Sequence, residues 1–265
     1  MLKIVAILSV TLLATPAFAG ATPWQDIAPG ARARLISADA VKDGKLLAGL
    51  ELDLPADTKT YWRIPGEAGI PTQFDFAGST GISDSLVLWP YPEIDKTEGL
   101  TDYVYHGHTV LPIELTASGG EGQLEASVVL GVCSDICVPA QAKFSLPITT
   151  GAPDPEQSLR LDQAVALTPI AWDQPNPPFG AVTATSNGLA IASIDPAVDP
   201  RSLIADVGDP AILFAAPQKS PEGGTWLLKL LGGSAAPGLE GRTVQLTFRT
   251  AMGPYAVSQK IAAAH

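Results

Sequence analysis

Short apolar segments separated by turn residues constrain the fold of this chain more than any other feature of its sequence. The 25 glycines and 24 prolines are spread along the whole length, and between them apolar residues alternate with polar ones or run in short blocks. This pattern is typical of β-strands joined by tight turns. We therefore expect an all-β protein, with strands near residues 45–54, 60–64, 72–78, 85–92, 103–117, 123–133, 142–149, 180–195, 210–217, 225–231 and 243–262.

The spacing of these segments predicts two β-sandwich domains. About seven short strands in roughly 125 residues is the number found in an immunoglobulin-like sandwich. A stretch rich in Thr, Gly, Pro and acidic residues at 149–158 then interrupts the pattern, and we interpret it as a linker. We expect an immunoglobulin-like domain at 20–150 and a second β-sandwich at 151–265.

Three segments carry more specific expectations. Residues 103–117 form either one long strand or two strands that break near Pro112. Residues 243–262 resemble a hairpin that turns near Gly253 and Pro254. Residues 199–208 are expected to form one helical turn.

The first nineteen residues have the features of a secretory signal peptide. Lys3 is followed by an apolar run at 4–14 and then by Ala17-Phe18-Ala19, which fits the small-x-small rule for cleavage after Ala19. The alternative is an uncleaved anchor, but the run is shorter than the roughly 20 residues that a spanning helix needs. We therefore expect export without membrane insertion of the mature chain, into a compartment where disulfides can form.

Charge and motifs exclude several classes of function. The chain has 27 acidic and 16 basic residues, and its formal net charge is −11 at pH 7. Nucleic acids and anionic membranes attract basic proteins, so neither is an expected partner. The sequence contains no Gly-x-Ser-x-Gly nucleophile motif and no phosphate-binding glycine loop, and its carboxylates show no acid/base spacing. We expect no cofactor.

The two cysteines, Cys133 and Cys137, lie in the stretch GVCSDICVP (131–139). A disulfide needs Cα atoms roughly 4.4–6.8 Å apart, whereas residues four apart in one strand are about 13 Å apart. The preceding Val-rich strand and the following Pro139 argue against a helix. A hairpin with residues 134–136 as its loop would bring the two Cα atoms to about 4.5–5.5 Å.

The small ring that this disulfide would close leaves two interpretations open. On the chain-entropy model the bond stabilises the fold by on the order of 2 kcal/mol, against about 4.7 kcal/mol for a loop of about 100 residues. A pair at a loop tip is also open to attack by the thiolate of another protein. The pair is therefore either a redox-active dithiol or a structural clip, and the spacing does not separate these two possibilities.

The segment GVCSDICVPAQAKFSLPI (131–148), preceded by YWRIPGEAG (61–69) and LWPYP (88–92), resembles the N-terminal periplasmic domain of the DsbD family, including ScsB-type proteins. The resemblance spans roughly residues 30–150. It implies an immunoglobulin-like fold, a periplasmic location and a thiol:disulfide oxidoreductase of the protein-disulfide reductase type. Cys133 and Cys137 would be its redox-active, catalytic pair.

The resemblance also implies partners. Electrons would come from a membrane thiol electron donor and pass to periplasmic thioredoxin-like or disulfide isomerase proteins. The transmembrane bundle and C-terminal thioredoxin-like domain of full-length members are not found in this sequence, so we expect a separate membrane protein as donor. Members of the family are linked to cytochrome c biogenesis and copper tolerance. A loop shields the cysteines in the family, and the candidate for it here is 65–71.

The alternative function is a non-catalytic envelope binding module, for copper or for a protein partner, with the cysteines as a structural clip. His106 and His108 are two apart and would share one face of a strand. Together with the cysteines they could form an N2S2 metal site, and thiolates suit Cu(I). The competing interpretation is two half-exposed strand histidines without metal.

Two further points stay open in the sequence. Asp135 is either an ordinary turn residue or a charge that raises the pKa of a neighbouring thiol, and the sequence does not indicate which cysteine reacts first.

Six aromatic residues cluster in the first domain: Tyr61, Trp62, Trp89, Tyr91, Tyr103 and Tyr105. We expect most of them to pack in the core and a minority to lie near the cysteines.

Overall fold

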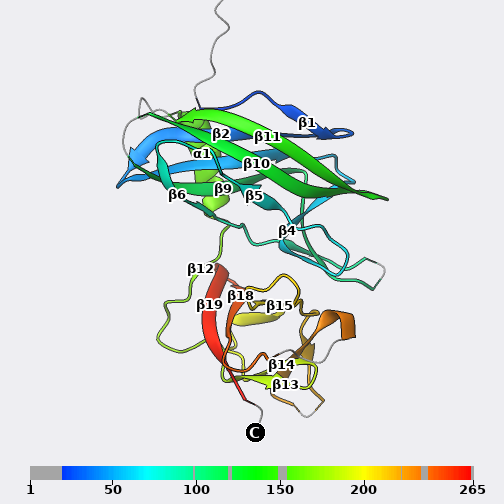
Figure 1. Cartoon of the computed structure of the whole chain (residues 1–265). Helices are drawn as coiled ribbons and strands as arrows, with labels where there is room; N and C mark the ends of the chain where they lie inside the picture. Colours follow the sequence, from blue (N-terminus) through cyan, green and yellow to red (C-terminus); the bar gives the residue numbers. More distant parts are fainter. Residues whose placement is uncertain are drawn as a thin grey trace, which may run out of the picture.

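The computed structural model describes residues 20–97, 99–118, 121–148, 154–221, 223–233 and 238–263. The predicted signal peptide at 1–19 and the first residues of the predicted linker lie outside these ranges. The described chain is mostly β, as predicted, and it has one α-helix (Figure 1). No helix in these ranges is long and apolar enough to cross a membrane.

The first half of the chain is an immunoglobulin-like sandwich of two sheets. The five-stranded sheet has the order β1 (Gln25–Ala28), β2 (Ala31–Lys42), β3 (Lys45–Asp53), β9 (His108–Ala117), β6 (Ile82–Val87). The six-stranded sheet has the order β11 (Cys137–Ile148), β10 (Gly122–Cys133), β4 (Lys59–Gly66), β8 (Asp102–His106), β7 (Glu93–Asp95), and β5 (Gln73–Asp75) pairs with β10.

Alternation of side chains along the strands builds the core between these sheets. In β10 every second residue from Leu124 to Val132 points inward and is buried, and the intervening residues up to Val129 are partly exposed. Trp62 of β4 is 1% exposed and lies edge-on to Tyr103 of β8. The period-two pattern therefore identified the inward face correctly.

The second half is one eight-stranded sheet folded around its own core, which includes Phe179 and Phe248. Its strands follow the order β15 (Val198–Asp206), β18 (Thr243–Thr250), β19 (Gly253–Ala262), β13 (Val182–Thr185), β14 (Gly188–Ala192), β17 (Thr225–Lys229), β16 (Gln218–Lys219), and β12 (Ile170–Ala171) pairs with β19. A short 3-10 helix, η1, spans Leu231–Gly233. The predicted hairpin at 243–262 is confirmed, and it turns just before Gly253.

Two local predictions are wrong. Residues 199–208 do not form a helical turn, because they belong mainly to β15, whose Leu203 and Ile204 are buried and which pairs with β18 around an irregularity. Residues 103–117 do form two strands, but the break falls at Gly107, whose φ of 60° lets the chain leave one sheet for the other. Pro112 lies inside β9.

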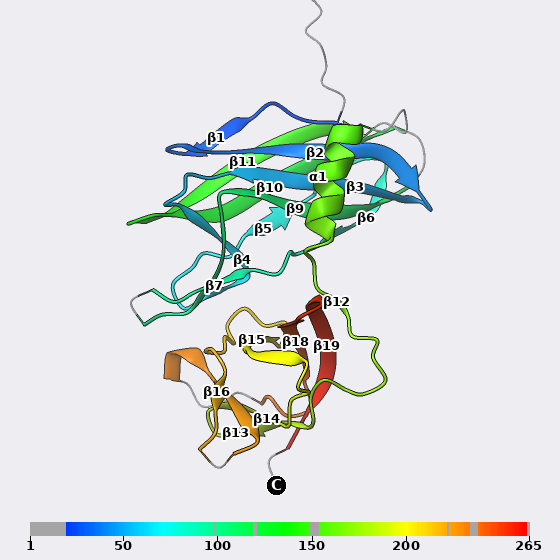
Figure 2. The same cartoon turned by 180° about the vertical axis from the view of Figure 1, so that it is seen from behind.

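The helix α1 (Pro155–Val165) covers the outer face of the five-stranded sheet (Figure 2). Asp154 caps its N-terminus by accepting from the backbone N–H groups of Glu156 and Gln157, and Pro155 begins its first turn. Leu161 is fully buried over Gly49, where a Cβ would lie 2.8 Å from Leu161 Cδ2. The sequence predicts that the residues of α1 belong to the second domain, yet the helix packs on the first sandwich. The division at residue 150 stays a prediction.

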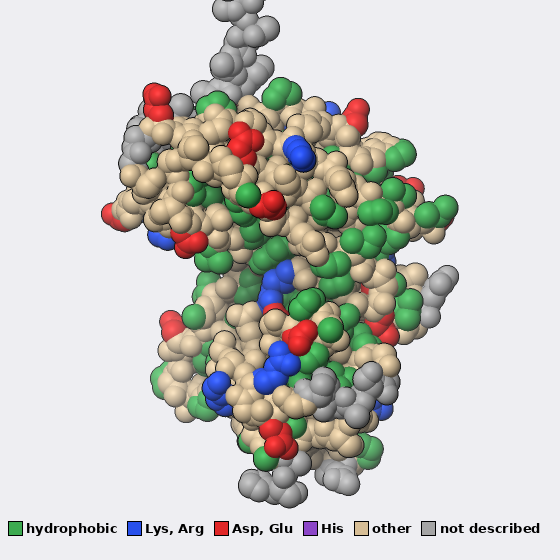
Figure 3. All heavy atoms as spheres, in the orientation of Figure 1, with side chains coloured by type: hydrophobic (Ala, Val, Ile, Leu, Met, Phe, Trp, Pro, Cys, Tyr) green, Lys and Arg blue, Asp and Glu red, His purple; other side chains and the backbone are tan. Residues whose placement is uncertain are grey.

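The two halves meet across a narrow waist, where basic and hydrophobic side chains gather on the surface (Figure 3). Arg63 of β4 forms an ion pair with Asp206 and donates to Gln245 Oε1 at 2.6 Å. The Tyr91 hydroxyl donates to the backbone carbonyl of Ser202. Ile204 of the second half packs into the core cluster of the first. Polar and apolar contacts therefore both connect the halves.

Candidate functional site

The cysteines lie at the tip of the hairpin formed by β10 and β11. The strands pair in continuous register from Gly122 opposite Ile148 to Cys133 opposite Cys137, which confirms the predicted hairpin. Residues 134–136 form its loop, in which the Ser134 N–H donates to the Ile136 carbonyl at 3.3 Å. Cys133 and Cys137 are joined by a disulfide, with Cα atoms 4.0 Å apart.

The two sulfurs lie in different environments. Cys133 is 2% exposed and packs against Tyr61 and Val104 in a small apolar cluster on the outer face of the six-stranded sheet. Cys137 is exposed, as are the residues around it from 134 to 139. Ile136 and Val138, on either side of Cys137, are 74% and 46% exposed. A partner protein can therefore reach Cys137 and a surrounding apolar patch, whereas Cys133 is covered.

Tyr61 provides a hydroxyl group next to the accessible sulfur. Its Oη lies 3.4 Å from Cys137 Sγ. Burial raises the pKa of Tyr61, so the hydroxyl stays protonated and can donate to sulfur at neutral pH. Hydrogen bonding to the charged form of a thiol favours that form, so Tyr61 is placed to stabilise a thiolate at Cys137.

Lys59 places a positive charge in the same region. It pairs with Cys133 across β4 and β10, and its Nζ lies 5.8 Å from the ring centroid of Tyr61. Burial alone would lower the pKa of Lys59, but its hydrogen bonds to Asp95 and Asp102 and the charges around it outweigh burial and raise this pKa. The ammonium group therefore stays charged between Asp95 and Asp102, near the ring of Tyr61.

The candidate shielding loop, residues 65–71, lies against Tyr61. A Cβ at Gly69 would be 2.2 Å from Tyr61 Cδ1, so only glycine lets the backbone approach the ring this closely. Thr72 Oγ1 donates to the Tyr61 carbonyl at 2.9 Å, and the Ala68 N–H donates to Asp102 Oδ1 at 3.0 Å. The loop covers the ring beneath the disulfide and leaves Cys137 itself exposed.

The two histidines do not share a face of one strand, so that expectation is wrong. The bend at Gly107 puts His106 in β8 and His108 in β9, which belong to different sheets. His106 Nδ1 lies 3.4 Å from Glu93, and His108 Nε2 lies 2.6 Å from Glu51. In the part of the chain that the structure describes, no three or more His, Cys, Asp or Glu residues are grouped to hold a metal ion. The N2S2 set is not assembled.

Most of the aromatic side chains fill the core as expected, and Tyr61 is the exception at the disulfide. Lys59 was not identified from the sequence. Its position beside Cys133 depends on the pairing of β4 with β10, which brings together two residues 74 apart in the chain. A period-two count from Trp62 would have placed Tyr61 and Lys59 on the outer face, but it could not have identified their neighbours.

The fold and the hairpin together define a class: immunoglobulin-like domains that carry a cysteine pair at an exposed hairpin tip. Residues 25–149 match the family model described as the N-terminal domain of the thiol:disulfide interchange protein DsbD. The resemblance seen in the sequence is therefore confirmed for these residues.

A solved structure extends the similarity beyond the matched domain. The N-terminal periplasmic domain of ScsB from Proteus mirabilis superposes with a TM-score of 0.69 at 22% sequence identity, covering 93% of this chain and 100% of that one. At this identity the likeness concerns the fold, and it includes most of the second half. A search of curated proteins found no match.

Proposed function

We propose that this chain is a periplasmic thiol–disulfide exchange protein that relays electrons through Cys133 and Cys137. The observation that carries the proposal is the asymmetry of the pair: one sulfur is exposed at a hairpin tip beside a hydroxyl donor, and the other is buried behind it. A structural clip needs no such difference. The match of residues 25–149 to the thiol:disulfide interchange family supports the proposal.

The exposed Cys137 reacts first. In the reduced protein its thiolate attacks one sulfur of a partner disulfide, so that a Cys137–partner disulfide forms and the other partner sulfur leaves as a thiolate that takes up a proton. The Cys133 thiolate then attacks Cys137 Sγ, which closes the intramolecular disulfide and releases the second partner thiol. Two electrons pass from this protein to its partner.

The partners follow from this direction of electron flow. A membrane thiol electron donor reduces the Cys133–Cys137 disulfide, and periplasmic thioredoxin-like or disulfide isomerase proteins receive the electrons. The signal peptide expected at 1–19 delivers the chain to the periplasm. Under this proposal the protein is a thiol:disulfide oxidoreductase, and Tyr61 is a positioning residue that favours the Cys137 thiolate.

Single-cysteine variants test the proposal. Cys133→Ala leaves the exposed thiol without its resolving partner, so it should accumulate mixed disulfides with periplasmic thioredoxin-like proteins on a non-reducing gel. Cys137→Ala is the matched control, because the remaining Cys133 is buried and should trap far less. Equal trapping by both variants would contradict the assigned order, and no trapping by Cys133→Ala would contradict exchange activity itself.

A further inference from the structure

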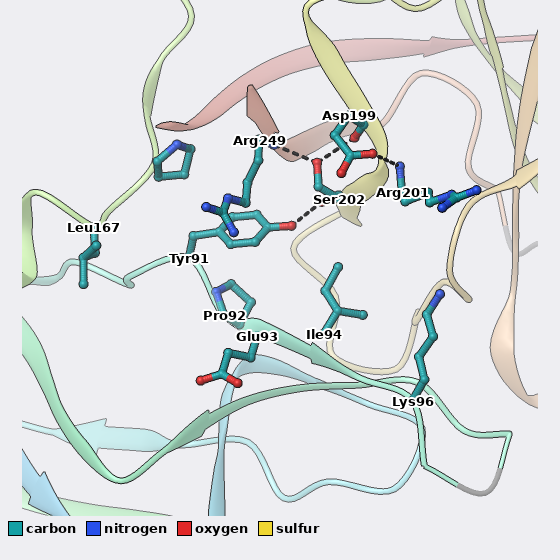
Figure 4. A pocket seen from close by; sticks show the side chains of 11 residues that line it. Tyr91, Pro92, Glu93, Ile94, Lys96, Leu167, Asp199, Arg201, Ser202 and Arg249 are labelled. Atoms are coloured by element: carbon teal, nitrogen blue, oxygen red, sulfur yellow. Dashed lines mark hydrogen bonds between the residues drawn. The ribbon is translucent and has the colours of Figure 1, made fainter. Parts of the chain in front are cut away.

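A cleft of about 610 Å³ lies between the two halves (Figure 4). The segment that leads into and follows β7 lines it from the first half, and β15, β18 and the start of β19 line it from the second. A second hollow of about 280 Å³ adjoins it, since Lys96 and Arg201 line both. The second hollow adds Lys219 and Trp226. The two hollows form one elongated trough.

Positive side chains without carboxylate partners gather in this trough. Lys96, Arg201, Lys219 and Arg249 line it, and within the described residues none of them forms an ion pair. Seven cations elsewhere in the described chain do pair with carboxylates: Arg32, Arg34, Lys45, Lys59, Arg63, Arg160 and Arg242. Four other described cations also form no ion pair: Lys42, Lys143, Lys229 and Lys260. The trough is lined by two carboxylates, Glu93 and Asp199, against its four cations, so positive charge predominates there.

The backbone of β15 directs Arg201 toward the first half. The strand is irregular between Asp199 and Ile204, and such bulges re-aim side chains. The Arg201 N–H donates to Asp199 Oδ1 at 3.0 Å, and Ser202 Oγ accepts from the Arg249 N–H at 2.8 Å. Figure 4 shows Lys96 pointing from the first half toward the second, where the side chain of Arg201 runs along the wall of the cleft.

The trough lies at the same end of the molecule as the disulfide. Asp95 of β7, next to Lys96, forms an ion pair with Lys59, which is beside Cys133. From β10 across β4 and β8 to β7 there are three strand spacings, about 14 Å. In Figure 2 the tip of β10 and β11 projects to the same side of the molecule on which β7 and β16 lie. A protein docked on Cys137 can therefore reach the trough.

We propose that this trough binds an acidic segment of the protein that exchanges disulfides with Cys137; this inference rests on the proposed function. The trough is open and elongated, which suits an extended peptide chain. Its positive charges complement the negative charges of Asp and Glu side chains. Tyr91 beneath Arg249 and the nearby Trp226 offer flat apolar surfaces between the charges. Complementary charges of this kind mainly accelerate association.

Two synthetic peptides test this inference on the full mature chain carrying Cys133→Ala. Each has one cysteine activated as a 2-pyridyl disulfide, followed by a flexible linker and four glutamates in one peptide or four glutamines in the other. The Cys137 thiolate attacks the peptide sulfur, a Cys137–peptide disulfide forms, and pyridine-2-thione leaves and is measured. The glutamate peptide should react about tenfold faster at low salt, and near 1 M salt, where charges are screened beyond about 3 Å, this advantage should vanish.

Charge reversal identifies the trough as the cause. Arg201→Glu with Arg249→Glu should abolish the advantage of the glutamate peptide and leave the rate of the glutamine peptide unchanged. Lys42→Glu with Lys229→Glu, at exposed cations outside the trough, is the matched control and should retain the advantage. Circular dichroism of each variant checks that the fold persists.

The outcomes separate the two proposals. If the glutamine peptide reacts but glutamates bring no advantage, or if the control pair removes the advantage as well, the trough does not bind an acidic segment and the exchange function stands. If neither peptide reacts, the exchange function fails and this inference fails with it. Tighter binding of inorganic tripolyphosphate than of a thiol-free glutamate peptide would overturn the assignment to a protein segment.

Discussion

At the scale of single residues, the contact between Tyr61 and Cys137 is the feature that most affects reactivity. The hydroxyl lies 3.4 Å from the sulfur at the exposed side of the pair. A single hydrogen bond to a charged group contributes about 1.5–3 kcal/mol when it is buried, and less where water competes. The contact is therefore large enough to change the population of thiolate at neutral pH.

Replacing Tyr61 with Phe removes this donor and keeps the ring. We expect the pKa of the Cys137 thiol, measured in the Cys133→Ala background by thiolate absorbance, to rise by about one unit, which corresponds to about 1.4 kcal/mol. The exchange rate near pH 7 should fall several-fold. Tyr103→Phe, in the core on the other face of the sheet, is the control and should leave the thiol pKa unchanged.

The redox pair could be proposed from the sequence, because only a hairpin joins cysteines at that spacing beside Pro139. The unequal exposure of the two sulfurs could not be predicted, since it depends on Tyr61 and Val104 from other strands. The prediction that His106 and His108 share one face of a strand was wrong because Gly107 adopts a positive φ and ends the strand between them. A glycine between the two histidines is the sequence feature that could have indicated this bend.

At the scale of elements, a buried carboxylate fastens α1 to the sandwich. Glu51 of β3 is fully buried and accepts from Arg34 of β2, from His108 of β9 and from Arg160 of α1. Burial tends to raise the pKa of Glu51, but the hydrogen bonds and the positive charges outweigh it and lower this pKa below its ordinary value of 4.5. The ionised form is therefore the one that stabilises the fold.

This lowered pKa predicts acid sensitivity. Because the pKa of Glu51 is lower in the folded state than in the unfolded state, its contribution is complete above the ordinary value of 4.5 and is lost as the pH falls through the folded value. Glu51→Gln should cost about 3 kcal/mol at pH 7, because it removes the buried charge that Arg34 and Arg160 both contact. The free energy of unfolding, measured with urea, should fall less between pH 7 and pH 3 in the variant than in the wild type.

Glu114→Gln provides the control for this measurement. Glu114 forms an ion pair with Lys45 at the surface, where both side chains are more than a third exposed. Exposed pairs of this kind contribute about 0–1 kcal/mol. A Glu114→Gln effect as large as that of Glu51→Gln would contradict the assigned role of the buried carboxylate.

The predicted elements show where local patterns succeed. Alternation identified the strands that bury one face, such as β10, because one face of each meets the core. It missed α1, since Asp154 and Pro155 look like linker residues unless they are recognised as a helix cap and first turn. It assigned a helical turn to β15 because Asp-Pro-Arg-Ser has the composition of a helix start, whereas pairing with β18 determines the outcome.

At the scale of the whole molecule, the contact of Arg63 joins the two halves. Its guanidinium lies 4.5 Å from the ring centroid of Trp62 and binds Asp206 and Gln245 of the second half. The two partners are more than 140 residues from Arg63 in the chain. No local pattern could have predicted this interface, although the family resemblance and the all-β class were predictable.

Arg63→Ala should loosen the connection between the halves. It leaves Asp206 without its cation at a mostly buried position, which we expect to cost about 2–3 kcal/mol. Calorimetry should show the unfolding transition of the wild type broaden or split into two in the variant. Arg32→Ala, which removes an exposed pair with Asp53, should cost less than about 1 kcal/mol and leave the shape of the transition unchanged.

The reduction potential of the Cys133–Cys137 disulfide tests the central claim most directly, because it separates electron exchange from structural stapling. Equilibration of the mature chain with a defined thiol–disulfide buffer, followed by trapping and separation of the two forms, gives this value. We predict a potential near or above about −230 mV, in the range of exchange-active couples. A value below about −300 mV would mark a structural bond and contradict the account.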